Sequence, residues 1–496
     1  MKQMLKKMGV GFLVAIFLTV NMMPTLGVFA EAAETGSITI ENPEPEKSYD
    51  IYQIFDLTYA GTTEKNVSYT LAPGWEDFFT TGDGKDYLVA DTPENSKLNP
   101  IVVGNATKRI NITKDNVDKF AAAAFAFAVK NKTPKTVTAG KNAAPVKESG
   151  LDLGYYLVYP RGATDVKEGQ KSIVSLTSTT KDATVQIKAT YPTITKKAKK
   201  TTADYGEGIP YTITGKVPDT NGYDTYIYTI TDTLSEGLTL DANSVKVEIG
   251  GADKTADSNI TCEKDVAAGT LKIDFKMLNL QDLKGKEIKV TYTAKLNDKA
   301  VIGQGGNAKG NTNKAQLTYS NNPKDSSQTT TPGETVSVYT GSITIDKHDG
   351  GDKNKKEKKK LSGAKFILQN AEKKYYKYDA TTQKVSWVAK EEADTVETDK
   401  NGAAAFKGLK NGDYQLIETE APKGYNKLTK GVAVTVKGES QVAADSLVAD
   451  VENNTGSELP GTGGMGAKIF IIIGGGIGLL AAGMYRRNRK MNAGNR

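Results

Sequence analysis

The sequence is dominated by short runs in which apolar and polar residues alternate, and glycines and Asn-Gly or Asp-Gly pairs separate these runs. Examples are "IPYTITGKV" from residue 209 and "EIKVTYTAKL" from residue 287. Successive side chains of a strand point to opposite faces, so this two-residue period predicts strands with one buried face. The glycine-containing pairs favour tight hairpin turns. We therefore expect a mainly β chain built of tandem immunoglobulin-like sandwich domains.

The length and one repeat predict how these domains are arranged. The chain has 496 residues, which is enough for roughly three domains. The motif "GSITI" occurs at 36–40 and again at 341–345, which suggests a repeated module. We expect an N-terminal β domain at 31–188, a middle sandwich at 189–337 and a C-terminal domain at 338–456. An Ala-rich run at 113–132 predicts a helix inserted in the first domain.

Both ends of the sequence have the pattern of processing signals. Residues 1–30 begin with lysines, continue with an apolar stretch and end in small residues, as a cleaved secretory signal does. Residues 457–496 contain an apolar run at 469–485 that is followed at once by arginines. Such a run is long enough to cross a bilayer, and the basic tail favours the cytoplasmic side. We expect an exported chain held by this anchor.

Charge and cysteine content exclude some classes of function. The formal charge is +7, but basic residues cluster at the two ends and are interleaved with acids elsewhere, which argues against a nucleic-acid partner. The Lys-rich block at 350–363 is interpreted as a solvated hairpin or loop. Cys262 is the single cysteine, so no intrachain disulfide can form. An exported chain without disulfides needs another means of stabilisation.

The segment before the apolar run resembles a known signal. It consists of Leu459, Pro460, Gly461, Thr462 and Gly463. This matches the Leu-Pro-x-Thr-Gly cell-wall sorting signal of Gram-positive bacteria. The resemblance implies that a membrane transpeptidase, a sortase, cuts after the threonine and joins its carbonyl to an amine. The proline and glycines keep the segment extended, so a protease-like cleft can bind it.

Three polar residues fall on strand faces that should be buried in the C-terminal domain. By alternation, Lys347, Glu418 and Asn453 each share a face with apolar neighbours. Burying such groups is costly unless they are paired. We expect an intramolecular amide between the lysine amine and the asparagine carboxamide, with the glutamate as acid and base. Burial favours a neutral, nucleophilic amine and a protonated carboxyl, and ammonia would leave.

A sequence motif supports this interpretation. "YQLIETEAPKGY" at 414–425 and "LSGAKFIL" at 361–368 resemble the collagen-adhesin B-type (Cna-type) domains of surface pilins. In that family a glutamate at the position of Glu418 has the acid-base role. The resemblance therefore implies a Lys347–Asn453 isopeptide bond.

The middle domain repeats the pattern with an aspartate. Lys196, Asp232 and Asn313 fall on predicted inward faces, in an order that resembles middle domains of backbone pilins. Lys197 and Asn311 are the alternatives if the register shifts by one or two residues. Both bonds are expected to join the first and last strands of their domains. In the first domain, Val158 and Tyr159 occupy the place of the acid motif, so no such bond is expected there.

From residue 31 to 462 the chain resembles the backbone (major) pilins of Gram-positive sortase-assembled pili. The resemblance implies a secreted, wall-anchored shaft subunit whose partners are a sortase, identical subunits, accessory pilins, peptidoglycan and host surface ligands. In such pilins a lysine of the next subunit, in a Tyr-Pro-Lys motif, accepts the threonine carbonyl. Here the sequence reads Tyr191-Pro192-Thr193. Lys188, on the outward face of its predicted strand, is the expected acceptor, and the alternatives are Lys197, Lys199 and Lys200.

Two other classes of function stay open at this stage. A monomeric wall-anchored adhesin would carry the same signals but would lack a working acceptor lysine. A wall-bound hydrolase would need a catalytic cluster, whereas the chain has one histidine, His348, expected in a loop, and one cysteine. No run of residues is specific enough to indicate a metal or another cofactor, so none is expected.

Overall fold

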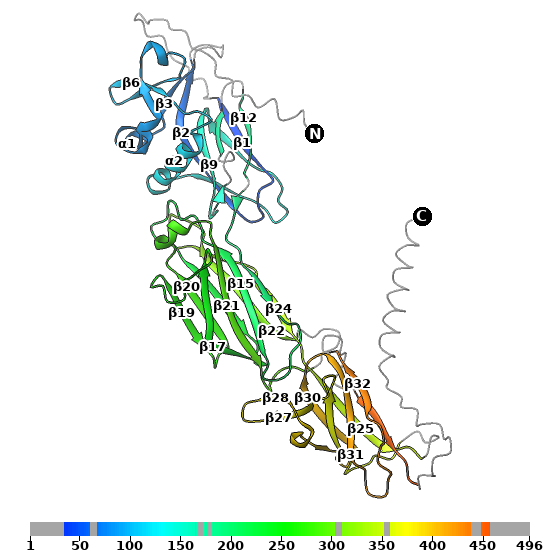
Figure 1. Cartoon of the computed structure of the whole chain (residues 1–496). Helices are drawn as coiled ribbons and strands as arrows, with labels where there is room; N and C mark the ends of the chain where they lie inside the picture. Colours follow the sequence, from blue (N-terminus) through cyan, green and yellow to red (C-terminus); the bar gives the residue numbers. More distant parts are fainter. Residues whose placement is uncertain are drawn as a thin grey trace, which may run out of the picture.

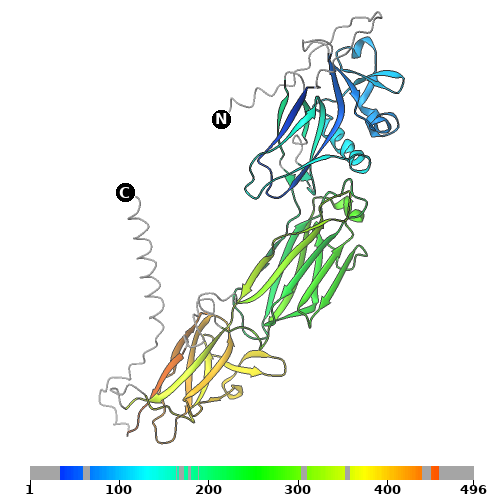
Figure 2. The same cartoon turned by 180° about the vertical axis from the view of Figure 1, so that it is seen from behind.

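The computed structural model describes residues 34–59, 67–163, 165–166, 172–176, 180–187, 189–302, 310–351, 358–437 and 448–456. These residues form three domains that follow one another end to end in chain order (Figure 1). The view from behind shows the same row of domains (Figure 2). Each domain is built from β-sheets packed face to face. The expected mainly β chain of tandem sandwich domains is confirmed.

The first domain combines a small and a large sheet. Its elements are β1 Thr35–Glu41, β2 Ser48–Tyr59, β3 Val67–Leu71, α1 Glu76–Thr80, η1 Asp83–Tyr87, β4 Leu88–Ala90, η2 Pro93–Asn95, β5 Pro100–Val103, β6 Ala106–Ile110, α2 Val117–Asn131, β7 Lys135–Thr138, β8 Val146–Asp152, β9 Gly154–Pro160, β10 Asp165–Val166, β11 Ser172–Leu176, β12 Asp182–Gln186 and β13 Ala189–Thr190. The small sheet has the order β12-β1-β8, and the large one β11-β9-β2-β3-β5-β6-β4 with β7 on β2. A short pair, β10-β13, leads to the next domain.

The helix expected at 113–132 is α2, which begins four residues later. Asn116 precedes it, and the Asn116 side-chain oxygen accepts a hydrogen bond from the Thr113 backbone at 2.6 Å. The buried face of α2 includes Phe120 and Phe125, and the Phe125 ring stacks on Tyr159 of β9 with centroids 3.5 Å apart. The Ala-rich sequence thus forms a helix that covers part of the large sheet.

The middle domain is a two-sheet sandwich. Its elements are β14 Thr195–Ala198, β15 Gly208–Lys216, β16 Tyr228–Leu234, β17 Leu238–Ile249, β18 Ala252–Asp253, β19 Ile260–Asp265, β20 Thr270–Phe275, η3 Met277–Leu283, β21 Glu287–Leu296, β22 Asn311–Ser320, β23 Gln328–Thr330 and β24 Glu334–Val338. One sheet has the order β14-β15-β21-β17-β18, and the other β19-β20-β16-β22-β23 with β24 on β22. Burial alternates residue by residue along β15 and β22, as the sequence pattern predicts.

The C-terminal domain pairs a three-stranded sheet with a larger one. Its elements are β25 Gly341–Asp349, β26 Lys365–Asn370, β27 Tyr375–Asp379, β28 Lys384–Val388, η4 Lys390–Glu392, β29 Val396–Glu397, β30 Ala403–Leu409, β31 Gly412–Glu420, β32 Val432–Val436 and β33 Val448–Asn453. The small sheet has the order β30-β25-β33, and the large one β28-β27-β26-β31-β32 with β29 on β26. The first and last strands, β25 and β33, run parallel as neighbours.

Specific contacts join the domains. Between the first and middle domains, the Lys130 ammonium lies 2.7 Å from the Asp224 carboxylate, and Lys47 lies over the ring of Tyr191. Between the middle and C-terminal domains, the Trp387 indole donates a hydrogen bond of 2.9 Å to the buried carboxylate of Asp204. These contacts orient each domain against the next one.

Residues 320–340 close the middle domain as part of one of its sheets. Their strands β23 and β24 both pair with β22, so they complete that sheet. The expected signal and membrane segments, 1–30 and 457–496, lie outside the described residues. In the described part of the chain, no helix has the length and apolar character to span a membrane.

Candidate functional site

In the C-terminal domain, the three residues predicted from the sequence come together between the sheets. Lys347 lies on β25, Asn453 lies on the neighbouring β33, and Glu418 lies on β31 of the opposing sheet. In the parallel register Lys347 is opposite Val451, and Asn453 is two residues further along. Each of the three polar residues has at most 2% of its surface exposed. The site is therefore shielded from solvent and lies in the middle of the sandwich.

Hydrogen bonds orient the amide and the carboxylate. The Asn453 Nδ2 donates to the Glu418 Oε2 at 3.0 Å, and the Leu428 backbone donates to the same oxygen at 2.7 Å. The Lys347 ammonium donates to the carbonyl oxygen of Val451 at 3.0 Å. Within the described residues, the other oxygens of Glu418 and Asn453 have no hydrogen-bond partner. The carboxylate thus contacts the nitrogen that would leave, and the carboxamide oxygen is free to take up charge.

Burial changes the acidity of the lysine. Removal from water lowers the pKa of Lys347 to about 8, although the nearby Glu418 carboxylate acts in the opposite direction. A lysine with such a pKa is uncharged far more often near neutral pH than an exposed one. Since only the uncharged amine is a nucleophile, burial prepares Lys347 to attack a carbonyl carbon.

A variant that keeps the buried lysine unbonded should show this shift as pH-dependent stability. In Asn453→Ala, Lys347 is expected to keep the lowered folded pKa of about 8 that burial gives it in the parent chain, against 10.5 in the unfolded chain. Between these values the unfolded chain binds more protons, so stability should rise with pH from about 8 to 10.5. The measurement is the denaturation midpoint across this window, with the parent chain as control. A variant whose midpoint follows the parent's at every pH would contradict the shift.

The middle domain brings together its own predicted set. Lys196 lies on β14 of one sheet, and Asp232 and Asn313 lie on the adjacent strands β16 and β22 of the other. The Lys196 ammonium forms an ion pair with the Asp232 carboxylate, and both side chains are fully enclosed. Asn313 is likewise buried, and its Oδ1 has no hydrogen-bond partner in the described part of the chain.

A fourth residue of this site, Tyr292 on β21, was not singled out by the sequence. Its hydroxyl donates to the Asp232 carboxylate. It accepts hydrogen bonds from the Lys196 ammonium and from the Asn313 Nδ2, each at 2.7 Å. The lysine and asparagine nitrogens are therefore within two hydrogen-bond lengths of each other. A tyrosine in an alternating strand usually indicates core packing, so the sequence held no specific signal for this role.

The charges of this site are shifted by burial. Desolvation lowers the pKa of Lys196 to about 8, and the Asp232 carboxylate counteracts part of that effect. Desolvation also raises the pKa of Asp232, in spite of the ion pair with Lys196. Both shifts favour transfer of a proton from lysine to aspartate, which leaves a neutral amine beside a neutral acid.

Lys197 and Asn311, the alternatives for a shifted register, lie outside this buried site. Lys197 is exposed. Asn311 is buried, but its side chain bonds to the backbone of Val301 and to the carbonyl oxygen of Val338, which holds a loop and β24 in place. The buried site thus contains Lys196, which pairs with Asp232, and Asn313, which bonds to Tyr292, and not these two alternatives. Asn313 lies on β22 and not on the last strand, so the expectation of a first-to-last-strand pair is wrong for this domain.

Two family models match the chain. Residues 205–323 match the Cna-B-like domain of Gram-positive pilin backbone subunit 2. Residues 341–447 match the prealbumin-like fold domain of SpaA.

Curated proteins and a solved structure agree with these matches. The trypsin-resistant surface T6 protein of Streptococcus pyogenes is 29% identical over 275 residues, which is 50% of this chain and 46% of that protein. The fimbrial subunit type 1 of Actinomyces viscosus is 26% identical over 72% of this chain and 76% of its own length. The solved T6 backbone pilin of S. pyogenes has a similar fold, with a TM-score of 0.50 at 21% identity over 82% of this chain and 81% of that one.

Two domains of the chain thus match domains of Gram-positive backbone pilins, and the chain resembles these pilins. It spans about half the length of the T6 surface protein. By their names, these relatives are a surface protein, a fimbrial subunit and a backbone pilin.

The expected acceptor lysines differ in their surroundings. Lys188 lies outside the described residues. Lys197 and Lys199 are exposed, whereas Lys200 is partly buried and bonds to Glu207 and to a backbone carbonyl. Tyr191, Pro192 and Thr193 help to line a cavity of about 730 Å³ between the first and middle domains, and Lys197, Lys199 and Lys200 are not among its lining residues.

In the first domain, the strand β9 resembles the acid-bearing strand β31 of the C-terminal domain, but its residues at that place pack in the core. Val158 is buried in the core between the small and the large sheet, and the Tyr159 ring stacks on Phe125 of α2. The buried acid of this domain, Asp50, instead forms an ion pair with the Arg161 guanidinium and accepts a hydrogen bond from Thr136. This arrangement holds β2 to β7 and to the end of β9.

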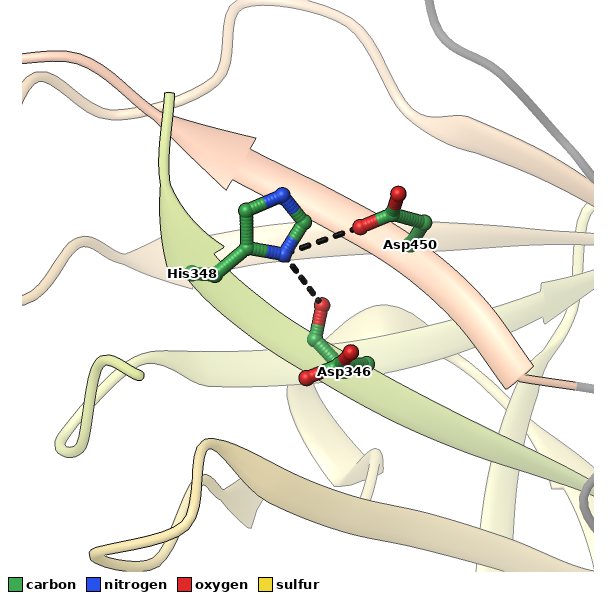
Figure 3. A group of neighbouring side chains, drawn as sticks. All are labelled: Asp346, His348 and Asp450. Carbon is green, nitrogen blue, oxygen red and sulfur yellow. Dashed lines mark hydrogen bonds and ion pairs between the residues drawn. The ribbon is translucent and has the colours of Figure 1, made fainter. Parts of the chain in front are cut away.

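The sequence suggested a loop position for His348, and this is wrong. His348 lies near the end of β25 and has no exposed side-chain surface. Its ring nitrogens lie 2.8 Å from Asp450 and 3.1 Å from Glu452. Asp346, His348 and Asp450 also lie close enough together to hold a metal ion (Figure 3). However, two lysine ammonium groups already pair with the carboxylates of this cluster: Lys358 with Asp450 and Lys360 with Asp346. We therefore interpret the cluster as an ion-pair network across β25 and β33.

Proposed function

We propose that this protein is the shaft subunit of a covalent cell-surface pilus. A sortase would cleave between Thr462 and Gly463 and pass the Thr462 carbonyl to a lysine of the next subunit. The observation that carries the proposal is the pair of buried Lys–acid–Asn sites in a row of sandwich domains. A shaft under tension needs domains that do not unfold, and an exported chain with a single cysteine cannot use intrachain disulfides for that.

At each site an intramolecular amide bond would form. The neutral lysine amine attacks the carboxamide carbon, the C–Nδ2 bond of asparagine breaks, and ammonia leaves. In the C-terminal domain Glu418 passes a proton from the lysine nitrogen to the Asn453 nitrogen, with which it already shares a hydrogen bond of 3.0 Å. In the middle domain Asp232 takes the proton from Lys196, with which it forms a buried ion pair. The protein would act only on itself, and not as an enzyme on other substrates.

The acceptor that we propose is Lys188. In the alternating sequence, Val185 and Ile187 fall on the inward face and Gln186 on the outward face, so the same pattern predicts an outward-facing Lys188. Lys197 and Lys199 are exposed alternatives close by in the sequence. The polymer would grow by head-to-tail joining of identical subunits, and its base would be linked to peptidoglycan.

Thr462→Ala should abolish polymerisation, because a sortase forms its acyl intermediate through the threonine carbonyl of an intact signal. Cell-wall extracts of a strain with the parent chain should give a ladder of bands that resists sodium dodecyl sulfate, and the variant should give the monomer alone. Ser457→Ala, just outside the signal, is the matched control and should keep the ladder. A parent strain with a single anchored band and no ladder would instead favour a monomeric wall-anchored adhesin.

A further inference from the structure

The two buried sites differ in how their acid reaches the nitrogen that must leave. In the C-terminal domain, Glu418 contacts the Asn453 Nδ2 directly. In the middle domain, Asp232 contacts Lys196 through one oxygen and Tyr292 through the other. No hydrogen bond of the described residues joins Asp232 to Asn313. The aspartate, which is one methylene shorter than glutamate, thus touches the attacking nitrogen but not the leaving one.

The Tyr292 hydroxyl bridges this gap. It lies 2.7 Å from the Lys196 nitrogen and 2.7 Å from the Asn313 Nδ2, and it donates to Asp232. A hydroxyl has one proton to donate and two lone pairs to accept with, so all its capacity is used within the site. We propose that Tyr292 is a catalytic residue of the middle domain, carrying a proton from the Lys196 nitrogen to the Asn313 nitrogen during amide formation. This inference rests on the middle-domain bond proposed above.

The proton balance of the reaction needs such a carrier. Lys196 first gives one proton to Asp232 and becomes a neutral amine. Its lone pair then forms the bond to the Asn313 carboxamide carbon, and the lysine nitrogen must lose a second proton while the Nδ2 gains one. Tyr292 passes its own proton to the Nδ2 and takes the proton of the lysine nitrogen. The C–Nδ2 bond then breaks, one ammonia leaves, and Tyr292 regains its original state.

The surroundings keep Tyr292 in place and protonated. Burial raises the pKa of Tyr292, and the Asp232 charge is a second cause. The hydroxyl is therefore protonated before and after it carries a proton. The Tyr211 ring stacks on the Tyr292 ring with centroids 5.4 Å apart and planes 13° apart. The hydroxyl is therefore positioned before the reaction starts, as an efficient proton carrier requires.

Tyr292→Phe tests the inference through the rate of ammonia loss in the full chain. The chain is synthesised in a cell-free system, and its intact mass is followed in time. The parent chain should lose two ammonia molecules. The variant should lose the one from Lys347 and Asn453 on time and the one from the middle domain about 100-fold more slowly. Tyr228→Phe, which removes another buried hydroxyl from the same core, is the matched control and should behave as the parent.

The outcomes separate the two proposals. If Tyr292→Phe loses both ammonia molecules at the parent's rate, the role of Tyr292 is overturned while the bond stands. If the parent chain never loses the middle-domain ammonia, the bond and the inference both fall. If Tyr292→Phe does not fold, 3-fluorotyrosine at position 292 keeps the hydroxyl but lowers its basicity. It should change the middle-domain rate severalfold, and an unchanged rate would overturn the inference.

Discussion

Lys347→Ala is expected to restore the mass of one ammonia and to lower the stability of the C-terminal domain by about 4–5 kcal/mol. The proposed bond closes a loop of more than a hundred residues between Lys347 and Asn453. By analogy with a disulfide, such closure stabilises by restricting the unfolded chain. The bond also joins the parallel strands β25 and β33, which hold the two ends of this domain together. Intact mass, thermal unfolding and resistance to trypsin measure the effect.

Two further variants separate the bond from simple packing. Glu418→Gln keeps the shape of the side chain and removes its acid-base function, so it should show the same gain in mass and a similar loss of stability. Lys365→Ala removes a partly exposed lysine that pairs with Glu420 on the domain's surface, and should leave mass loss and stability close to the parent. A Glu418→Gln chain that still lacks both ammonia molecules would sink the assignment of the acid.

Lys188→Ala is expected to abolish the covalent polymer while each subunit stays folded, because the sortase intermediate then lacks its acceptor amine. The high-mass ladder in wall extracts should disappear, and the monomer should remain. Lys181→Ala is the matched control, since Lys181 is a partly exposed lysine before β12 that pairs with Glu34, and it should keep the ladder. An undiminished ladder in Lys188→Ala would move the acceptor to Lys197, Lys199 or Lys200.

Much of both sites could be predicted from strand alternation. A polar residue that shares a strand face with buried apolar neighbours must itself be buried. This rule predicted the burial of Lys347, Glu418 and Asn453 without any tertiary information. The same rule predicted Lys196, rather than its neighbour Lys197, as the buried lysine of the middle domain. Strand pairing fixes faces strictly, because a slip of one residue would turn every apolar side chain to solvent.

The features that the sequence did not indicate depend on long-range pairing. Tyr292 acts through partners on three other strands of both sheets, and nothing in its own run of residues distinguishes it from a core tyrosine. β24 follows a Thr- and Pro-rich stretch that looks like a linker, and becomes a strand because β22 offers it a free edge. His348 precedes glycines and a Lys-rich block, yet pairing with β33 extends β25 past it.

The most direct test of the shaft proposal is the covalent structure of the polymer itself. Material extracted from the cell wall is digested with trypsin, and mass spectrometry is used to search for a branched peptide that contains Thr462. The account predicts a peptide whose C-terminal Thr462 is joined to the side chain of Lys188 from another subunit. Finding Thr462 attached to wall peptide alone would contradict it and would make this pilin relative a monomeric anchored protein.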